Sequence, residues 1–230
     1  MRRLHYELKG TGKTTLFIHG YMESTTMWKD VVIPDGMQAL FVDLPGHGQS
    51  LLADHPYQNL TDVALKISEL LDELSIETFN VIGHSMGGYV ALELKKADER
   101  CQRVMLLNSN FWTDSDAKKR DRLRVAEIAR HNHTLFVKEA IPALFLDPIR
   151  FNHEIDSLIK EAIQMEPEGI AVGALAMRNR MDNEALVREY EEEVMIVQGC
   201  DDTVVPIELM RKKIDGMNVD YHEIEGVGHM

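Results

Sequence analysis

The apolar positions along the chain form short continuous runs that alternate with amphipathic stretches. The runs predict buried strands at 15–18, 39–42, 79–82, 104–107 and 194–197. Residues 59–74 place apolar side chains at i, i+3, i+4 and i+7, which predicts an amphipathic helix with Asn59 or Thr61 as its N-cap. Strands that alternate with helices indicate an α/β fold, with a mostly parallel sheet flanked by helices.

Weaker patterns mark the two ends of this arrangement. Residues 4–9 predict an edge strand, residues 206–214 a helix and residues 218–224 a last strand. Residues 9–15 contain a Gly-Thr-Gly-Lys-Thr string that resembles a phosphate-binding loop. That motif requires a glycine where the chain has Glu7, and it requires a helix to follow, whereas a strand follows here. A hairpin turn between two strands is therefore predicted.

Residues 111–190 have a different character, because charges of both signs are interspersed with apolar residues and no strand pattern recurs. The spacing of the apolar residues predicts several short helices, with breaks near Pro142, Pro148 and Pro167; among these residues are Leu123, Ile128, Leu135 and Val137. Eighty residues are too many for a simple crossover between two strands. We expect a helical lid at 111–190 over a core built from 1–110 and 191–230, and the alternative is extra helices packed on one sheet face.

Residues 79–90 carry the strongest chemical signal. An apolar run ends at Gly83, Ser85 stands between Gly83 and Gly87 in a G-x-S-x-G frame, and a helical pattern begins at once. This strand–turn–helix context is typical of a nucleophile elbow, where a tight turn holds the serine hydroxyl above the sheet. Ser85 is therefore the candidate nucleophile, and the amide of Met86 would point at the substrate carbonyl oxygen.

Other residues with catalytic chemistry also follow predicted strands, where ligands bind in parallel sheets. His19-Gly20 follows the run at 15–18, an Asp-Asp pair follows 194–199, and His229 follows the last strand. Gly20 would let the backbone approach a substrate, so the amide of Tyr21 is the candidate second oxyanion donor. His19 itself is expected to brace its loop.

The loop that begins at Asp43 also holds His47 and Ser50. These three residues lie within eight positions on one turn, which suits structural bracing better than a relay across an active site.

Composition narrows the range of functions. The chain has 230 residues, and 25 Lys and Arg against 38 Asp and Glu give a net charge of −13, which argues against a nucleic-acid surface. No apolar run approaches the ~20 residues that span a bilayer, and the basic N-terminus lacks the apolar core of a signal peptide. Cys101 and Cys200 lie far apart and make no metal spacing. A cytoplasmic protein that needs no metal and no membrane is expected.

Five stretches together resemble the α/β-hydrolase superfamily over essentially the whole chain: HGYMESTTMW, DLPGHGQS, VIGHSMGG, VQGCDDTVVP and EGVGHM. The lid-bearing serine hydrolases are most similar, a group that includes carboxylesterases, enol-lactone hydrolases and cofactor-free haloperoxidase-like proteins. The resemblance implies Ser85 as nucleophile, Asp202 as acid and His229 as base. It also implies the amides of Tyr21 and Met86 as the oxyanion hole, and no cofactor.

Asp202 is preferred to Asp201 because the acid of this group lies three residues after the strand-ending glycine and four before the proline. Gly199 and Pro206 provide that frame for Asp202. A serine at the elbow, where relatives that attack carbon–halogen or epoxide bonds carry aspartate, argues against those reactions.

The expected function is hydrolysis of a small or medium carboxylic ester or lactone through an acyl-enzyme on Ser85. Two alternatives stay open: a carbon–carbon bond hydrolase or thioesterase with the same triad, and a non-enzymatic ligand sensor. Candidate pocket residues are Gly20, Trp28, Phe111, Trp112 and Phe145, and the last three are either lid core or pocket wall. The lid helices could mediate a dimer, so monomer and dimer both stay open.

The resemblance also implies a closing helix after the His229 loop, and no such helix precedes the last residue, Met230. The C-terminal helix is therefore expected to be missing. Either the sequence is part of a longer chain, or the base lies on a frayed terminus, and the second case predicts weak activity.

Overall fold

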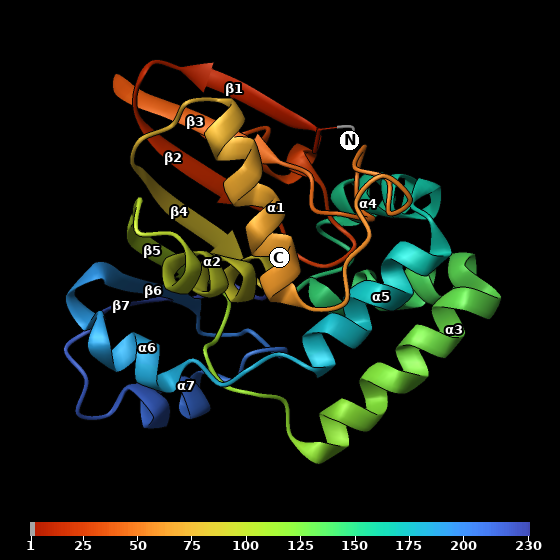
Figure 1. Cartoon of the computed structure of the whole chain (residues 1–230). Coiled ribbons are helices and arrows are strands. Elements are labelled where there is room, and N and C mark those ends of the chain that lie inside the picture. Colours follow the sequence, from red (N-terminus) through yellow and green to blue (C-terminus); the bar gives the residue numbers. More distant parts are fainter. Residues whose placement is uncertain (1–2) are drawn as a thin grey trace.

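One twisted sheet organises the described part of the chain, residues 3–230 of a computed structural model (Figure 1). Met1 and Arg2, the first residues of the expected core segment, lie outside the described residues. The strand order is β1-β3-β2-β4-β5-β6-β7, and every neighbouring pair is parallel except β1 and β3. The strands are β1 (Tyr6–Gly10), β2 (Gly12–Ile18), β3 (Gly36–Val42), β4 (Phe79–His84), β5 (Cys101–Leu107), β6 (Val194–Gly199) and β7 (Asp220–Ile224). The predicted mostly parallel α/β sheet is confirmed.

The predicted hairpin at residues 9–15 is wrong. β1 and β2 follow each other directly in sequence, but both pair with β3, which lies between them. Gly10 and Gly12 have positive φ values of 76° and 130°, which let the chain pass from one side of β3 to the other.

Two helices cover one face of the sheet. α1 (Leu60–Glu73) begins at a capping box in which Asn59 accepts from the Asp62 N–H, so Asn59 is the N-cap. α2 (Met86–Ala97) begins directly after Ser85. Their apolar faces and the inward residues of β2–β6 form the main hydrophobic core. Burying such side chains contributes roughly 25 cal/mol for each Å² removed from water.

A smaller cluster lies on the opposite face of β2 and β3. There the 3₁₀ helix η1 (Thr25–Trp28) packs Trp28 against Phe17 and Phe41, with an edge-on distance of 5.3 Å between the rings of Trp28 and Phe17. Trp28 thus fills a core site beneath the sheet, and the structure does not bring it to the side of Ser85.

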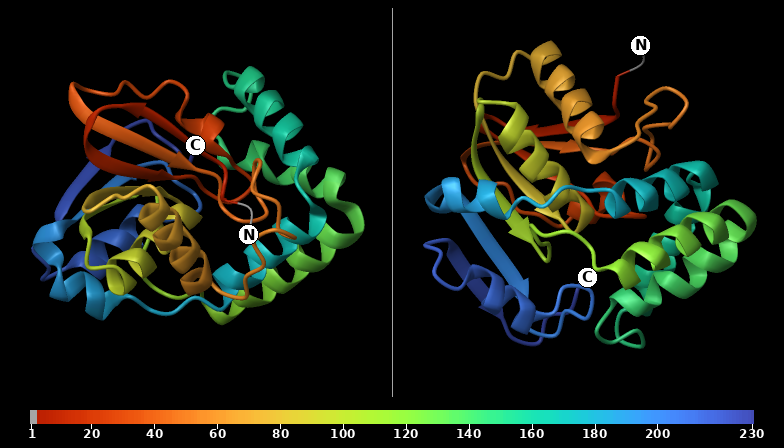
Figure 2. Two further views of the ribbon diagram at one scale, coloured as in Figure 1. Left: turned by 45° about the horizontal axis from the view of Figure 1, so that its top comes forward. Right: turned by 60° about the horizontal axis from the view of Figure 1, so that its bottom comes forward.

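Residues 111–190 form helices, as predicted. Those within 116–178 lie beyond the carboxyl ends of the parallel strands (Figures 1 and 2), whereas the last helix, at 184–189, packs against the main core beside the sheet. The helices are α3 (Asp116–Ala140), η2 (Pro142–Leu144), α4 (Asn152–Gln164), α5 (Pro167–Arg178) and α6 (Glu184–Glu189). Pro142 and Pro167 each stand at a helix start, where proline removes no needed hydrogen bond. α3, α4 and α5 bury a second core of their own.

α3 consists of two helical stretches that meet at a kink at the non-helical residue Asn132, which agrees with the prediction of several short helices. Its buried face is made of small and polar residues such as Ala126, Ala129 and His133. Of the apolar residues of α3 on which the prediction relied, Val137 is buried, whereas Leu123, Ile128 and Leu135 are 44–48% exposed.

The C-terminal part returns to the sheet. η3 (Glu191–Glu193) leads into β6, and α7 (Ile207–Ile214) connects β6 to β7. After β7 the chain turns back towards the helical segment, where the Met230 N–H donates to the Leu144 carbonyl at 3.2 Å. The loop that carries His229 is therefore held between the sheet and the helices.

Candidate active site

Ser85 occupies a strained turn between β4 and α2. Its φ of 49° and ψ of −116° lie in a region that a non-glycine residue rarely adopts. A Cβ atom on Gly83 would overlap the Gly87 carbonyl, so the turn requires glycine there. The Ser85 N–H donates to Leu107 O at 3.0 Å, and the Ser109 hydroxyl donates to Ser85 O at 2.6 Å. These contacts fix the backbone beneath the hydroxyl.

The structure brings Ser85, His229 and Asp202 together. The Ser85 hydroxyl lies 2.9 Å from His229 Nε2, and His229 Nδ1 lies 2.9 Å from Asp202 Oδ2. Because a carboxylate only accepts hydrogen bonds, Nδ1 carries the proton of a neutral ring, which leaves Nε2 free to accept from the Ser85 hydroxyl. A base is thus in place to take the serine proton.

Asp202 is held as a carboxylate. The amides of Val204 and Val205 donate to Oδ1 at 2.7 and 3.0 Å, and Gln198 Nε2 donates to Oδ2 at 3.2 Å. Burial alone would raise the pKa of Asp202, but the hydrogen bond and charge of His229 and these amides lower it below its ordinary value. The neighbouring Asp201 is exposed.

Asn108 positions the His229 loop, and the sequence analysis missed it. Its Nδ2 donates to the carbonyls of Gly228 and His229 at 3.0 Å each, and its Oδ1 accepts from the Gly199 N–H at 2.7 Å. It directly follows β5 and has a positive φ of 44°. The strand-end rule that singled out His19 and His229 would have found this residue too.

The amides of Tyr21 and Met86 lie on two segments that touch. A Cβ atom on Gly87 would overlap the carbonyls of Ile18 and His19, so the end of β2 lies against the first turn of α2. Met86 is the first residue of α2, where an N–H has no acceptor within the helix. The Tyr21 amide also has no hydrogen-bond acceptor within residues 3–230. Both donors remain available to a ligand.

His19 braces its loop, as predicted. Its Nε2 accepts from the Leu44 N–H at 2.9 Å and its Nδ1 donates to Gly20 O at 2.7 Å, a pattern that requires the neutral ring. Burial lowers the pKa of His19, which agrees with a neutral ring. Asp43 braces the adjacent loop by accepting from the amides of Thr25 and Gln49 at 2.7 and 2.8 Å.

Glu23 and His84, the residue before Ser85, form a buried ion pair that the sequence analysis also missed. Glu23 Oε2 accepts from the Gly20 N–H at 2.5 Å and lies 3.1 Å from His84 Nδ1, while His84 Nε2 lies 2.9 Å from His229 O. Both partners of the imidazole can only accept, so both ring nitrogens carry protons and His84 is charged. The pair thus connects the Gly20 loop with the His229 loop.

The pKa directions agree with an ion pair. Burial works against both charges, but the charge of Glu23 and its hydrogen bond raise the pKa of His84, and the charge of His84 lowers the pKa of Glu23. No local motif predicts the pair, because 61 residues separate its members.

Replacing Glu23 with alanine is expected to lower the free energy of unfolding by about 3–5 kcal/mol, because it leaves the His84 charge buried and unpaired. Urea denaturation followed by circular dichroism measures the change. Glu208→Ala is the matched control, since it breaks an exposed ion pair with Arg211 and should change stability by less than about 1 kcal/mol.

The pair also gives the stability a pH dependence. The contribution of His84, whose pKa is raised, is fully present below its ordinary value of 6.5 and is lost as the pH rises through the folded value. The contribution of Glu23, whose pKa is lowered, is present above its ordinary value of 4.5 and is lost as the pH falls through the folded value. If Glu23→Ala has the stability of the parent at pH 6, the ion-pair assignment is wrong.

The remaining predicted pocket residues fall into two groups. Phe111 is buried in the main core and meets the half-buried Trp112 edge-on, with ring centres 5.3 Å apart. Phe145 is half-buried in the helical segment, between Leu144 and Leu146, which both contact the His229 loop. The backbone at Phe145 therefore lies beside the loop that carries His229, whereas the Phe111 ring belongs to the main core.

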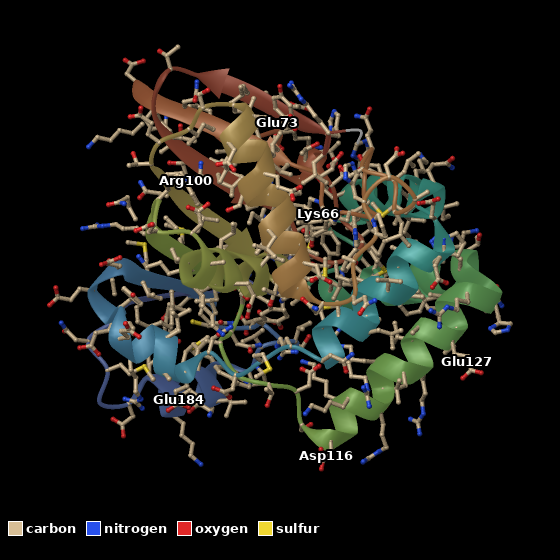
Figure 3. The ribbon with its side chains drawn as sticks, in the orientation of Figure 1. Lys66, Glu73, Arg100, Asp116, Glu127 and Glu184 are labelled. Atoms are coloured by element: carbon tan, nitrogen blue, oxygen red, sulfur yellow. The ribbon has the colours of Figure 1, made fainter. Side chains whose placement is uncertain are left out.

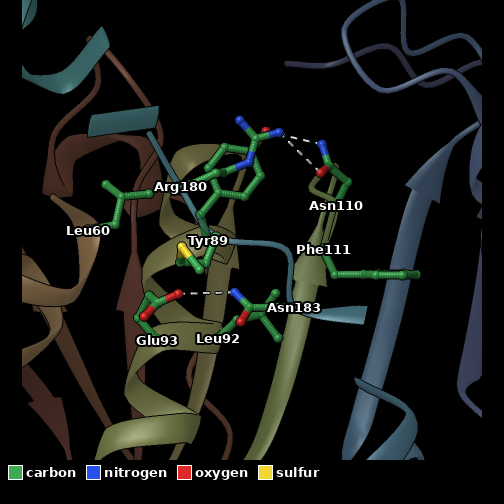
Figure 4. A pocket seen from close by; sticks show the side chains of 9 residues that line it. Leu60, Tyr89, Leu92, Glu93, Asn110, Phe111, Arg180 and Asn183 are labelled. Atoms are coloured by element: carbon green, nitrogen blue, oxygen red, sulfur yellow. Dashed lines mark hydrogen bonds between the residues drawn. The ribbon is translucent and has the colours of Figure 1, made fainter. Parts of the chain in front are cut away.

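A polar cluster beside α2 joins the two ends of the helical segment (Figure 4). The Arg180 guanidinium lies 4.2 Å from the Tyr89 ring centre and 2.9 Å from the Asp114 carboxylate. Asn183 Nδ2 donates to Glu93 at 3.1 Å. The segment therefore leaves and re-enters the sheet at one place.

Neither a metal cluster nor a membrane span is present in the described part of the chain. Residues 3–230 contain no group of three or more His, Cys, Asp or Glu side chains that could hold a metal ion. None of the helices within that range is long and apolar enough to cross a membrane.

Comparison with known proteins identifies related chains. A family model described as the alpha/beta hydrolase family matches residues 15–230. The chain is 27% identical to the structure of a thermophilic esterase from Thermogutta terrifontis (malate bound), with a TM-score of 0.89, covering 98% of this chain and 86% of that one. An enol-lactonase from Burkholderia xenovorans gives a TM-score of 0.85 at 22% identity, with coverages of 96% and 87%, which shows the shared fold.

A curated relative is longer. The dihydrolipoyllysine-residue acetyltransferase component of the acetoin cleaving system from Pseudomonas putida is 27% identical over 235 aligned residues, which cover 98% of this chain. The match covers 61% of that protein, so this chain spans less than two thirds of its length.

Proposed function

The chain belongs to the alpha/beta hydrolase family, and from this premise we propose that it is a serine hydrolase that cleaves a small or medium carboxylic ester or lactone. The observation that carries the proposal is the hydrogen-bonded series from Ser85 through His229 to Asp202, with both distances at 2.9 Å. The similarity to a thermophilic esterase supports the same reaction class.

In the proposed reaction, Ser85 attacks the ester carbonyl while His229 Nε2 takes the hydroxyl proton. Asp202 holds the imidazole in the required tautomer and stabilises its charged form. His229 then returns the proton to the leaving alcohol, which leaves an acyl group on Ser85. Water activated by the same nitrogen releases the acid.

The tetrahedral intermediate carries negative charge on the former carbonyl oxygen. We assign its stabilisation to the amides of Tyr21 and Met86, because Met86 directly follows Ser85, Tyr21 lies on the loop that leaves β2 against the first turn of α2, and both amides are free to donate. Removing one such donor typically costs about 3–4 kcal/mol of transition-state stabilisation.

We assign residues 111–190 as a lid. The position of α3, α4 and α5 beyond the carboxyl ends of the strands supports this role, because bound substrate would lie between them and Ser85. Their separate hydrophobic core supports it as well. Two residues of the core domain, Tyr21 and Met22, pack against that second core.

Two measurements on the native chain test the proposal. Short- and medium-chain nitrophenyl esters report turnover, and a fluorophosphonate probe followed by peptide mass spectrometry reports the nucleophile. We expect steady turnover and labelling of Ser85, with Ser109 unlabelled as an internal control. Labelling without steady turnover would favour a ligand sensor, and absence of labelling would overturn the assignment of Ser85. Faster cleavage of a thioester or a diketone would move the assignment to those reactions.

A further inference from the structure

Two cations occupy the inner face of α3, within the helical segment. Lys118 and Arg122 are four residues apart, so they lie one above the other on the helix. The Lys118 ammonium donates to Val204 O at 3.2 Å, and Arg122 Nε donates to the Asp114 carboxylate at 3.2 Å. Asp116 and Glu127 of the same helix point outwards (Figure 3). Lys118 and Arg122 therefore face the interior of the protein.

These cations lie beside the two loops that bracket Ser85. Val204, whose carbonyl accepts from the Lys118 ammonium, also donates its N–H to Asp202, and the charge of Asp202 acts to raise the pKa of Lys118. Arg122 is close enough to Tyr21 for its charge to oppose the rise in the phenol pKa that burial causes. One cation thus adjoins the Asp202 loop, and the other lies on α3, against whose core the Tyr21 side chain packs.

The positive charge of this cluster is not balanced from within. Arg122 and the buried Arg180 both pair with one carboxylate, Asp114, while Asp202 is engaged by His229 and two backbone amides. Burial and the charge of Arg122 lower the pKa of Lys118, as expected for cations that repel one another. This local excess stands in a chain whose net charge is −13.

Some N–H groups of these two cations have no hydrogen-bond acceptor in the described part of the chain. In the described part of the chain, Arg122 Nη1 and Nη2 have no acceptor, although the side chain is only 16% exposed. The Lys118 ammonium uses one of its three N–H groups. A half-buried guanidinium end next to a second cation is suited to a carboxylate, which accepts two parallel hydrogen bonds from such a fork.

We propose that Lys118 and Arg122 bind a carboxylate on the part of the substrate that does not react. The substrate class is then an ester or lactone that carries a free carboxylate, such as a half ester of a dicarboxylic acid. This inference rests on the proposed function for the position of the reacting group, while the anion site itself rests on the cations alone. Attraction of the anion also guides it to a site in an otherwise acidic protein.

A pair of substrates of equal length tests the inference. The 4-nitrophenyl half ester of glutaric acid carries a terminal carboxylate, and 4-nitrophenyl pentanoate does not. A charge-assisted hydrogen bond is worth about 1.5–3 kcal/mol, so kcat/KM for the half ester should exceed that for the neutral ester by about 10- to 150-fold. The preference should appear in KM, because a contact remote from the reacting atoms acts on binding. Equal values for the two esters would overturn the inference.

Single and double variants test whether Lys118 and Arg122 cause the preference for the half ester. Arg122→Gln and Lys118→Gln should each reduce the ratio of the two kcat/KM values, and the double variant should bring it close to one. Arg124→Gln is the matched control, because Arg124 is 73% exposed on the same helix and pairs with Asp121. It should keep the ratio of the parent. If Arg122→Gln fails to fold, Arg122→Lys, which keeps the charge and loses the fork, replaces it and should give an intermediate ratio.

A binding measurement separates this inference from the proposed function. Titration calorimetry with glutarate needs no turnover, so it tests the anion site even if no ester is cleaved. We expect glutarate to bind to the native chain and to bind at least tenfold more weakly to Arg122→Gln. Absence of binding, or equal binding by the two chains, would refute the site, whereas binding without ester turnover would refute the proposed function alone.

Discussion

Ser85→Ala is expected to lower kcat on a nitrophenyl ester by about 10⁴- to 10⁶-fold, with little change in stability. The variant keeps the strained turn but removes the oxygen that would form the acyl-enzyme, so only the oxyanion donors and substrate binding would remain. Ester hydrolysis measures the rate. Thermal unfolding followed by circular dichroism checks that the fold persists.

The three residues should act as a unit. His229→Gln alone should cost about as much as Ser85→Ala, and the double variant should be no slower than either single one, because a base without its nucleophile contributes nothing further. His222→Gln is the control, since His222 is an exposed histidine on β7. More than about one hundredth of the parent rate in pure, folded Ser85→Ala would exclude Ser85 as the nucleophile.

Asp202→Asn is expected to lower kcat by about 10⁴-fold, because an amide can donate to His229 Nδ1 and so stabilise the wrong tautomer of the ring. The other contacts of the side chain would largely persist, since the Asn oxygen can still accept from Val204 and Val205. The loss should therefore be in rate, while the melting temperature changes by a few degrees.

Asp201→Asn is the matched control for this experiment. Asp201 is exposed, and its side chain makes no hydrogen bond or ion pair within residues 3–230. The control should keep nearly the full rate. The reverse result, a large loss in Asp201→Asn and a small one in Asp202→Asn, would exchange the roles of the two aspartates.

Local sequence patterns predicted the parts of this fold that depend on neighbouring residues. The β4–Ser85–α2 turn, the capped helix after Asn59 and the apolar parallel strands all follow from residues within about one helical turn of each other. The pairing of β1 with β3 does not, because β1 pairs with a strand that begins 26 residues after β1 ends and not with β2, which follows it directly.

The helical segment shows a second reason for error. Apart from Val137, the buried face of α3 is built from Ala126, Ala129 and His133, which give a weak apolar signal. Stronger apolar residues such as Leu135 lie on its exposed side. Close packing of α5 against α3 selects small side chains there, so the volume available decided the pattern more than hydrophobicity did.

The candidate site likewise contains residues that local sequence patterns predicted and residues that they did not. Ser85, Asp202 and His229 were found because each follows a strand and matches a short motif. Glu23 and His84 meet across 61 residues, and Lys118 and Arg122 face inwards only because α3 lies where it does. Such pairs have no signature in a single sequence, since tertiary packing alone brings their members together.

The joined ends of the helical segment have a consequence for protein engineering. The Asn183 N–H donates to Phe111 O at 2.8 Å, and Arg180 Nε donates to Trp112 O at 3.1 Å, so the chain enters and leaves the segment at the same point. A replacement of any length then needs to close only a short gap, and the entropy of closing a loop grows slowly with its length. We expect that residues 112–182 can be exchanged as one module for the helices of a related hydrolase. Such chimeras would keep the Ser85 machinery and take their substrate preference from the donor.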